Sequence, residues 1–497
     1  SAIVTLLDNI SSLYYFQSEL LLCFGILTLL VVSVYKNASI KSFYITVSTL
    51  LLSLLSTFYL IFDQANFTSG FKFLFLGSIV IDFYSNFFKV IFLLSVLAII
   101  LLTYNNKEVK REDWSEYYCL ILITTLGMFL MSSSLNLLMI YLAIEMVSIP
   151  SYMLAGFNHN DKGSNEASMK YVLYGSFASG LMLFGMSWIY GQAGSLYLND
   201  IGEYMMSATQ FQFTSLISFI LLFVGFGYKI SSAPFHYWVP DVYEGSPTPM
   251  TAFFAVAPKV AGFALLIRFL YTTMAQLNFS SHSIEAIYVD WNFILAVLSA
   301  ITMTIGNILA IRQSDVKRVL AYSSISHVGF IMMGFSVISF TAVTHMLFYI
   351  VMYVLMTLGA FAILILFTDK YKFSSVSDWD GIGYIHPFIC SLMVINLMAL
   401  AGLPPTSGFV AKFYIFATII ESKTYYWLAV VAILNTVVAL YYYFNIARAM
   451  FLESPSERSR EKPDYITASV IFITSIQGIL FYVYWSDLYN IIQRLFS

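Results

Sequence analysis

The sequence predicts an all-α polytopic membrane protein with about fourteen transmembrane helices. Of its 497 residues, 59% are hydrophobic and only 10% are charged, whereas soluble domains carry roughly 25% charged residues. The apolar residues form long runs that short polar or Gly/Pro segments interrupt. Because a helix needs about 20 mostly apolar residues to cross a bilayer, the chain has room for roughly fourteen spans and little else.

The expected spans follow the apolar runs in chain order. They cover residues 18–35, 42–62, 83–104, 115–131, 134–157, 166–190, 211–233, 248–271, 291–311, 317–339, 341–368, 387–420, 424–452 and 465–492. Residues 66–82 are amphipathic and too interrupted to span, and residues 199–207 are expected to form a polar loop. We divide the chain into an N-terminal three-helix region (1–114), helices four to eight (115–271), helices nine to thirteen (272–452) and a C-terminal loop with the last helix (453–497).

Basic residues in the loops indicate how the chain is oriented, because short loops on the inner side of a membrane are enriched in Lys and Arg. If the spans alternate, fourteen basic loop residues share one side: Lys36, Lys41, Lys107, Lys110, Arg111, Lys162, Arg312, Lys317, Arg318, Lys370, Lys372, Arg458, Arg460 and Lys462. The other side holds Lys72, Lys423 and Arg494. This asymmetry places the basic loops inside and both termini outside.

Seven basic residues remain, and all lie within expected spans: Lys89, Lys170, Lys229, Lys259, Arg268, Lys412 and Arg448. Lys89, Arg268 and Arg448 are near helix ends, where a long side chain can extend its charge to the interface. Lys170 is about one turn inside its helix and is ambiguous. Lys229, Lys259 and Lys412 are flanked by apolar turns on both sides. Burial disfavours the charged form of lysine, so these three can exchange protons near neutral pH.

Two of the expected spans contain breaks. Pro234 follows two serines in the seventh helix, and Pro404 and Pro405 follow Gly402 in the twelfth. Proline removes a backbone hydrogen bond, so the freed carbonyl groups must face protein or water inside a membrane. One lysine precedes the first break and another follows the second. This arrangement predicts two inverted five-helix repeats, helices four to eight and nine to thirteen, with broken helices 7 and 12.

Glu145 is the one carboxylate placed deep within an expected span, near the middle of helix five. An ionised carboxylate in hydrocarbon is unfavourable unless it is paired or protonated. Glu145 is therefore either one member of a structural salt bridge or a proton-path residue coupled to a lysine on a neighbouring helix.

Histidines offer two further relay candidates. His236 follows the break in helix seven, and His327 lies within helix ten. Either could bridge waters between lysines, or could simply have its hydrogen bonds satisfied within the protein. His345 is a weaker candidate. No CxxC pair, Walker sequence, nucleophile elbow or haem-binding motif is present in the sequence, so we expect no cofactor or redox centre in this chain and no nucleic-acid partner.

Four blocks of sequence carry a family resemblance. They are EASMKYVLYGSFASG at 166–180, KISSAPFHYWVPDVYEGSPTPMTAFFAVAPK at 229–259, QSDVKRVLAYSSISHVG at 313–329 and LAGLPPTSGFVAKFYIF at 400–416. With these blocks the chain resembles the subunit 2 (NuoN-type) family of antiporter-like membrane subunits of respiratory complex I. The first hundred and the last forty residues match that family only in hydropathy.

The resemblance implies a fourteen-helix fold and a role for each of four residues. Glu145 and Lys229 would be the input pair, Lys259 the central relay and Lys412 the gate to the far side. A lysine at position 412 is typical of subunit 2, whereas the subunit 4 type carries glutamate there. His345 has no secure counterpart in the family, and no role is transferred to it.

The resemblance also implies a place in a larger assembly. Flavin, iron–sulfur clusters and ubiquinone are expected in other subunits, and the partners would be membrane-arm subunits, including the subunit 4 and subunit 4L types, accessory subunits and lipids. The expected location is the mitochondrial inner membrane, with a bacterial plasma membrane or a thylakoid as alternatives. The competing functional hypotheses are an Mrp-type cation/proton antiporter subunit, an independent sodium/proton antiporter and a purely structural scaffold.

Overall fold

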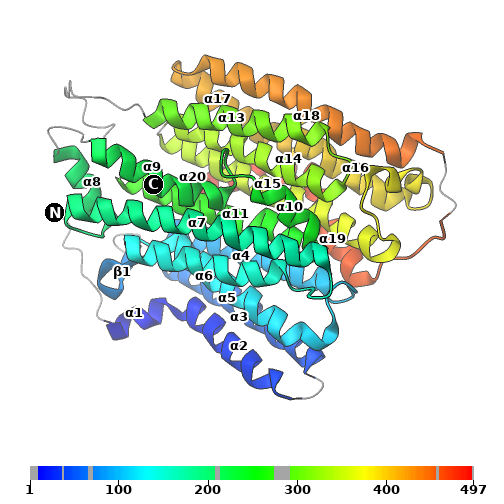
Figure 1. Ribbon diagram of the computed structural model, residues 1–497, viewed down its shortest axis with the longest axis horizontal. Helices are drawn as coiled ribbons and strands as arrows, with labels where there is room; N and C mark the ends of the chain where they lie inside the picture. Colours follow the sequence, from blue (N-terminus) through cyan, green and yellow to red (C-terminus); the bar gives the residue numbers. More distant parts are fainter. Residues whose placement is uncertain are drawn as a thin grey trace.

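The computed structural model describes residues 9–35, 38–64, 71–207, 213–273, 291–337, 339–454 and 458–494. Figure 1 shows long helices lying side by side, with α2 and α3 at one edge of the bundle and α17 and α18 at the other. The elements of the N-terminal region are α1 (Asn9–Tyr15), α2 (Gln17–Ser33), α3 (Ser39–Gln64), β1 (Phe71–Leu74), β2 (Ile79–Asp82) and α4 (Phe83–Thr103). The strands β1 and β2 form an antiparallel hairpin in which Phe71 pairs with Asp82.

Two further groups of helices and a C-terminal pair complete the described fold. The first group is α5 (Trp114–Ser133), α6 (Leu137–Ala155), α7 (Lys162–Ala193), α8 (Leu198–Ser207), α9 (Phe213–Ile230), α10 (Trp238–Gly245) and α11 (Thr248–Thr273). The second group is α13 (Trp291–Ile311), α14 (Val316–Met332), α15 (Phe340–Tyr371), α16 (Pro387–Ala401), α17 (Ser407–Ser422) and α18 (Tyr426–Leu452). The last helices are α19 (Tyr465–Leu480) and α20 (Trp485–Gln493).

The membrane-protein class that the sequence predicts is confirmed. Eleven helices in the described part of the chain are long and apolar enough to span a bilayer, or twelve if α1 and α2, which meet at an 82° bend, count as one span. The shorter apolar helices at Thr214–Ile230 and Pro387–Ala401 precede the two breaks. The total of fourteen spans and the relation between the two repeats stay predictions.

Both predicted helix breaks are present. Helix α9 ends at Ile230, and α10 begins seven residues after Ser231, which has a φ of 68°. Helix α16 ends at Ala401, and Gly402 with a φ of 81° turns the chain before α17 begins. The amide of Ala233 donates a hydrogen bond to Thr302 Oγ1 on α13 at 3.0 Å. Neighbouring side chains thus satisfy backbone groups at a break, as a membrane interior requires.

One local prediction is wrong. Residues 199–207 were expected to form a polar loop, but they belong to helix α8. Leu198, Ile201 and Met205 recur at helical spacing and are all buried. Packing of this apolar stripe against α11 outweighs the polar residues of the segment, as is usual for a short amphipathic helix.

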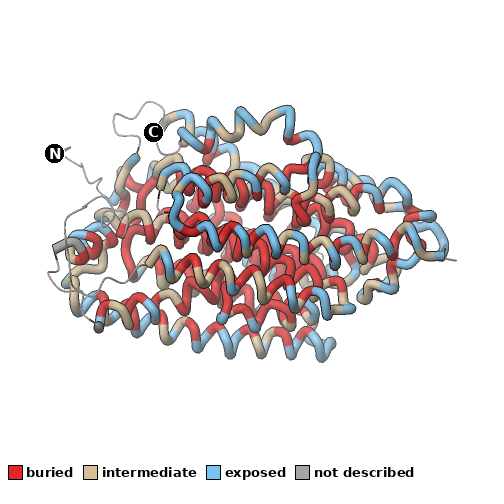
Figure 2. The backbone as a smooth tube through the Cα atoms, turned by 90° about the horizontal axis from the view of Figure 1, so that it is seen from above, coloured by how far each residue is buried: buried red, intermediate tan, exposed pale blue. Residues whose placement is uncertain are grey.

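Helices α11, α14 and α15 form the centre of the bundle. Their side chains are buried along nearly the whole length of each helix, whereas α3, α7, α18 and α19 present most of one face outward. Figure 2 shows the same distribution, with buried residues along the middle and exposed residues on the outermost helices. We call the side with Lys107, Lys110, Arg111 and Lys370 the basic side, and the side with the β1–β2 hairpin the opposite side.

Candidate functional site

Glu145 and Lys229 are each hydrogen-bonded to a serine, and Lys229 contacts the helix that carries Glu145. Glu145 is half-buried on α6 and accepts a hydrogen bond from Ser179 on α7. Lys229 is buried at the end of α9 and donates from Nζ to Ser148 Oγ at 3.0 Å. Ser148 is one turn beyond Glu145 on α6, so the two hydrogen bonds meet on the same helix. Glu145 forms no ion pair in the described part of the chain, which argues against the salt-bridge alternative.

Lys259 occupies the centre of the molecule. It follows Pro258 on the enclosed helix α11, and only 1% of the residue is exposed. Its Nζ donates to Ser324 Oγ on α14 at 2.6 Å and lies 5.1 Å from the centre of the Tyr243 ring on α10. The hydroxyl group of Ser324 and the face of the Tyr243 ring therefore stabilise the ammonium group in place of a carboxylate. The hydrogen bond to Ser324 can exchange its proton.

His327 lies between two tyrosines. Its Nδ1 is 2.8 Å from Tyr349 Oη on α15, and its Nε2 is 3.2 Å from Tyr443 Oη on α18. Tyr443 also contacts the hydroxyl of Ser323, the residue beside Ser324. The imidazole is thus hydrogen-bonded to two tyrosine hydroxyls, one of which contacts Ser323, while Lys259 bonds the neighbouring Ser324. These contacts are consistent with both readings of His327, as a relay and as a satisfied histidine.

Lys412 is held against the break in the second repeat. The side chain is buried, and its Nζ donates to the carbonyl oxygen of Ala401 at 2.9 Å. That carbonyl ends α16 and has no partner further along a continuous helix. The ammonium group is also 4.4 Å from the centre of the Phe330 ring, which is one turn beyond His327 on α14. The helix break therefore exposes the carbonyl group of Ala401, which accepts the hydrogen bond of Lys412.

Two predicted site residues lie apart from this series. Lys170 is partly exposed and forms ion pairs with Glu166 and Asp241, both at 2.7 Å. His236 is buried at the first break and stacks on Tyr237, and its Nδ1 has no hydrogen-bond partner among the described residues. The structure gives neither residue a contact with the buried lysines.

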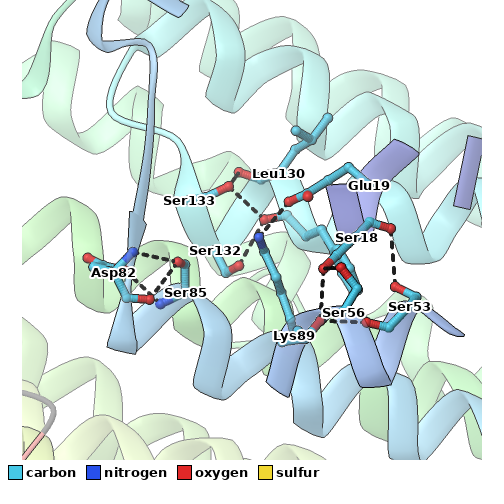
Figure 3. Close-up of polar contacts among 12 residues, drawn as sticks. Ser18, Glu19, Ser53, Ser56, Asp82, Ser85, Lys89, Leu130, Ser132 and Ser133 are labelled. Atoms are coloured by element: carbon cyan, nitrogen blue, oxygen red, sulfur yellow. Dashed lines mark hydrogen bonds and ion pairs between the residues drawn. The ribbon is translucent and has the colours of Figure 1, made fainter. Parts of the chain in front are cut away.

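The interface reading of Lys89 and Arg268 is wrong. Lys89 is fully buried and lies 2.5 Å from Glu19, a fully buried carboxylate that the sequence did not single out (Figure 3). Arg268 forms a bidentate pair with Asp82, with both nitrogen-to-oxygen distances 2.9 Å, and donates to the carbonyl of Ser132. Position near a helix end does not reveal a partner on another helix. Arg448 is exposed, as expected.

Sequence reasoning missed the hydroxyl groups that join the charged residues. Ser148, Ser324, Tyr349 and Tyr443 each contact one of the predicted site residues. Serine and tyrosine are frequent in this chain, so their presence alone carried no signal. The spacing of Ser324 and His327, three residues apart on one helix, is the one pattern that could have indicated the link.

The assembled site contains five protonatable residues, Glu145, Lys229, Lys259, His327 and Lys412, with hydroxyl groups beside them inside apolar helices. A hydroxyl group both donates and accepts, so it can pass a proton between its neighbours. No group of three or more metal-binding side chains occurs in the ranges that the structure describes. The arrangement can therefore move protons along the middle of the bundle.

Comparison with known proteins gives matches along most of the chain. A family model described as "NADH:quinone oxidoreductase/Mrp antiporter, TM" matches residues 134–439. The "NADH-quinone oxidoreductase subunit N 2" of Sorangium cellulosum is 38% identical over 99% of this chain and 98% of that protein. A chain of respiratory complex I from Thermus thermophilus is 28% identical, has a TM-score of 0.77 and matches over 95% of this chain and 98% of its own. A chain of the Mrp complex from Dietzia sp. DQ12-45-1b has a TM-score of 0.80 at 18% identity over 97% of both chains, a likeness of fold alone.

Proposed function

The chain belongs to the NADH:quinone oxidoreductase/Mrp antiporter family, and on this premise we propose that Glu145, Lys229, Lys259, His327 and Lys412 conduct protons through it. The observation that supports this order most directly is that Lys259 bonds Ser324, while the neighbouring Ser323 contacts Tyr443, whose hydroxyl is hydrogen-bonded to His327. These contacts lie between Lys259 and Lys412, where the sequence indicated only His327 as a possible relay.

Electrostatic repulsion between neighbouring sites gives the series its direction. Two like charges about 8 Å apart repel by roughly 2 kcal/mol at an effective dielectric constant of about 20. A proton that arrives at Lys229 therefore disfavours the charged form of Lys259, and so pushes a proton onward. Glu145 acts in the opposite sense to a neighbouring lysine, because its negative charge attracts the ammonium group and so favours the protonated form of Lys229.

The protein acts as a proton-translocating membrane-arm subunit of NADH:quinone oxidoreductase. The subunit N relatives support this assignment, since their alignment covers nearly the full length of both chains. Quinone reduction elsewhere in the complex would drive the protons from the basic side to the opposite side. Flavin, iron–sulfur clusters and the quinone would be held by other subunits, and the neighbours would be membrane-arm subunits of the subunit 4 and subunit 4L types together with accessory subunits.

A bacterial plasma membrane is the location that the comparisons favour. The relatives and the complex I structure reported above come from bacteria. The mitochondrial inner membrane expected from the sequence has no support among them. The multi-pass character of the chain is independent of this choice, because it follows from the long apolar helices.

The alternative function, an Mrp-type cation/proton antiporter subunit, rests on likeness of fold at 18% identity. The subunit N relatives at 38% identity favour the complex I assignment. Sodium-dependent transport by the chain purified alone would favour the antiporter. Migration of the native chain with NADH-oxidising activity would favour the complex.

Replacement of Lys229 tests the function. In the complex reconstituted into vesicles, Lys229→Ala is expected to reduce the number of protons moved per NADH oxidised. Arg448→Met removes an exposed basic residue of α18 and is the matched control, expected to pump like the wild type. Unchanged pumping by Lys229→Ala would exclude a role for this residue.

A further inference from the structure

A second buried ion pair lies in the N-terminal helices, outside the proposed series. Glu19 on α2 and Lys89 on α4 are each 0% exposed, and Lys89 Nζ is 2.5 Å from Glu19 Oε1. In Figure 3 the two side chains reach toward each other from their helices, close to the end of α5 with Ser132 and Ser133. Ionisable residues inside a membrane are rare and usually functional.

Few other groups stabilise the charges of this pair. Apart from their contact with each other, neither the carboxylate oxygens of Glu19 nor Nζ of Lys89 has a hydrogen-bond partner among the described residues. The ring of Phe129, 5.6 Å from the ammonium group, adds one weak attraction. A buried ion pair without further hydrogen bonds gains little over its neutral form, because desolvation offsets the attraction. The pair is therefore held mainly by the attraction between its own two charges.

Neutral hydrogen bonds beside the pair also hold α2 against α3. Ser18 contacts both Ser56 and Thr57 on α3, at 3.2 and 3.1 Å, and Ser53 donates to the carbonyl of Ser18 at 3.1 Å. These hydroxyl groups join α2 to α3 next to Glu19 (Figure 3). Since neutral hydrogen bonds already fix the helix, an ion pair at the same level needs another explanation.

Polar groups connect the pair to the opposite side. Helix α1 is bent by 82° from α2, so it runs across the end of the bundle when α2 spans the bilayer. Gln17 starts α2 at this bend, is partly exposed and has a buried amide nitrogen without a protein partner. Asn86, one turn before Lys89 on α4, is fully buried and neither side-chain atom has a protein partner. Such groups are normally hydrogen-bonded to water, so a hydrated route to the pair is expected here.

Asp82, which precedes α4, and Arg268, which lies on α11, neutralise each other. Asp82 begins α4 at the opposite side, and both nitrogens of the Arg268 fork bind its carboxylate. No other ion pair forms among the described residues of α2, α3, α4 and α5. The electric field of the Asp82–Arg268 pair at Glu19 and Lys89 is therefore that of a compact dipole rather than that of a net charge.

We propose that Glu19 and Lys89 form a proton-exchanging pair that opens to the opposite side and takes part in proton release. An N–H bond of the Lys89 ammonium breaks, the proton moves to Glu19 Oε1 and an O–H bond forms, so that both groups become neutral. The acid can then release this proton to water beside Gln17, and the neutral amine accepts the next proton that the proposed series delivers. The role in release rests on the proposed function, whereas the exchange itself does not.

The test uses the whole complex in vesicles with a variant that removes both charges, Glu19→Gln/Lys89→Met. Each single replacement leaves an uncompensated buried charge and is expected to impair assembly, whereas the double variant removes both charges and is expected to assemble. The matched control is Glu453→Gln/Arg448→Met, which removes an exposed ion pair at the end of α18. Two quantities are measured: protons moved per NADH, and the infrared carbonyl band of a protonated carboxyl group during turnover.

The expected result is that the double variant assembles but moves fewer protons per NADH than the control, and lacks a carbonyl band that the wild type shows. If the double variant moves as many protons per NADH as the wild type, the pair has no role in proton release and is purely structural. Absence of a Glu19-dependent carbonyl band would overturn the exchange. Lys229→Ala, measured in parallel, separates the proposals: if it pumps normally while the double variant does not, the proposed series fails and the Glu19–Lys89 site stands.

Discussion

Lys412 bonds the carbonyl oxygen of Ala401 across the break between α16 and α17, at 2.9 Å. The lysine thus depends on the geometry of the break for its hydrogen bond. Gly402 lies between them in space: a Cβ atom built on it would be 2.7 Å from Cδ of Lys412, and its φ of 81° is one that other residues rarely adopt. The position of the charge and the shape of the backbone are therefore coupled.

Gly402→Ala is expected to displace Lys412 and reduce pumping. The left-handed conformation costs a residue with a Cβ about 1–2 kcal/mol, and the lysine must also move away from the new methyl group. The measurement is protons per NADH in vesicles. Gly180→Ala on α7 is the matched control, because a Cβ there meets no atom within 4 Å. Equal pumping by both variants would contradict the coupling.

Ser324→Ala is expected to slow proton transfer at Lys259. A hydrogen bond to a charged group contributes about 1.5–3 kcal/mol, and a barrier higher by about 1.4 kcal/mol slows a step roughly tenfold. The rate of proton release after a single quinone reduction would reveal the change. Ser176→Ala removes an outward hydroxyl that bonds only its own helix and should release protons at the wild-type rate.

Tyr443→Phe is expected to interrupt the line between Ser323 and His327. The variant loses the hydroxyl that contacts both residues, while the ring and its packing are kept. Each lost neutral hydrogen bond contributes about 1 kcal/mol, so pumping should fall several-fold and stability only slightly. Tyr441→Phe, two residues earlier and exposed, should change neither. A normal proton-to-electron ratio in Tyr443→Phe would show that His327 is a satisfied histidine and not a relay.

The ionisation of Asp82 makes the stability of the folded protein depend on pH in the acid range. Burial alone would raise the pKa of its carboxyl group, but the charge and hydrogen bonds of Arg268 and the hydrogen bonds of Ser85 lower the pKa below its ordinary value. A lowered pKa contributes stability that is fully present above the unfolded pKa of about 3.9 and is lost as pH falls through the folded pKa. The melting temperature of the wild type should therefore drop below about pH 4.

Asp82→Asn is the corresponding variant. It should melt at a lower temperature than the wild type at pH 7, because the paired charge is gone, and the difference should shrink as pH falls below about 4. Thermal unfolding in detergent between pH 7 and pH 3 measures this. Asp200→Asn alters an exposed carboxylate at the start of α8, so its difference from the wild type should stay small throughout. A constant deficit for Asp82→Asn at all pH values would contradict the assignment.

The sequence was informative wherever a residue conflicts with its own neighbours. Lys229, Lys259 and Lys412 were predicted as buried because apolar turns flank each of them, and all three are buried. The two breaks were predicted because proline cannot continue a helix, and both are present. Helix α8 was not predicted, because its composition is typical of a polar loop although Leu198, Ile201 and Met205 recur at helical spacing.

The carboxylate partners of Lys89 and Arg268 could not be predicted from the local sequence. Lys89 and Arg268 were expected at the interface from their places near helix ends, yet each has a carboxylate partner brought by another element. Glu19 precedes Lys89 by 70 positions and Asp82 precedes Arg268 by 186. Nothing in either local segment records such a contact.

The amino-acid sequence by itself determined that this chain crosses a membrane, where its helices break and that Lys229, Lys259 and Lys412 are buried, because hydrophobic transfer and proline geometry act on each segment separately. Only the tertiary structure decided that Ser324 bonds Lys259, that Tyr443 bonds His327 and that Glu19 neutralises Lys89. These contacts depend on how helices distant in the chain are rotated and packed. A side-chain hydrogen bond extends only about 3 Å, so small changes in that packing make or break it.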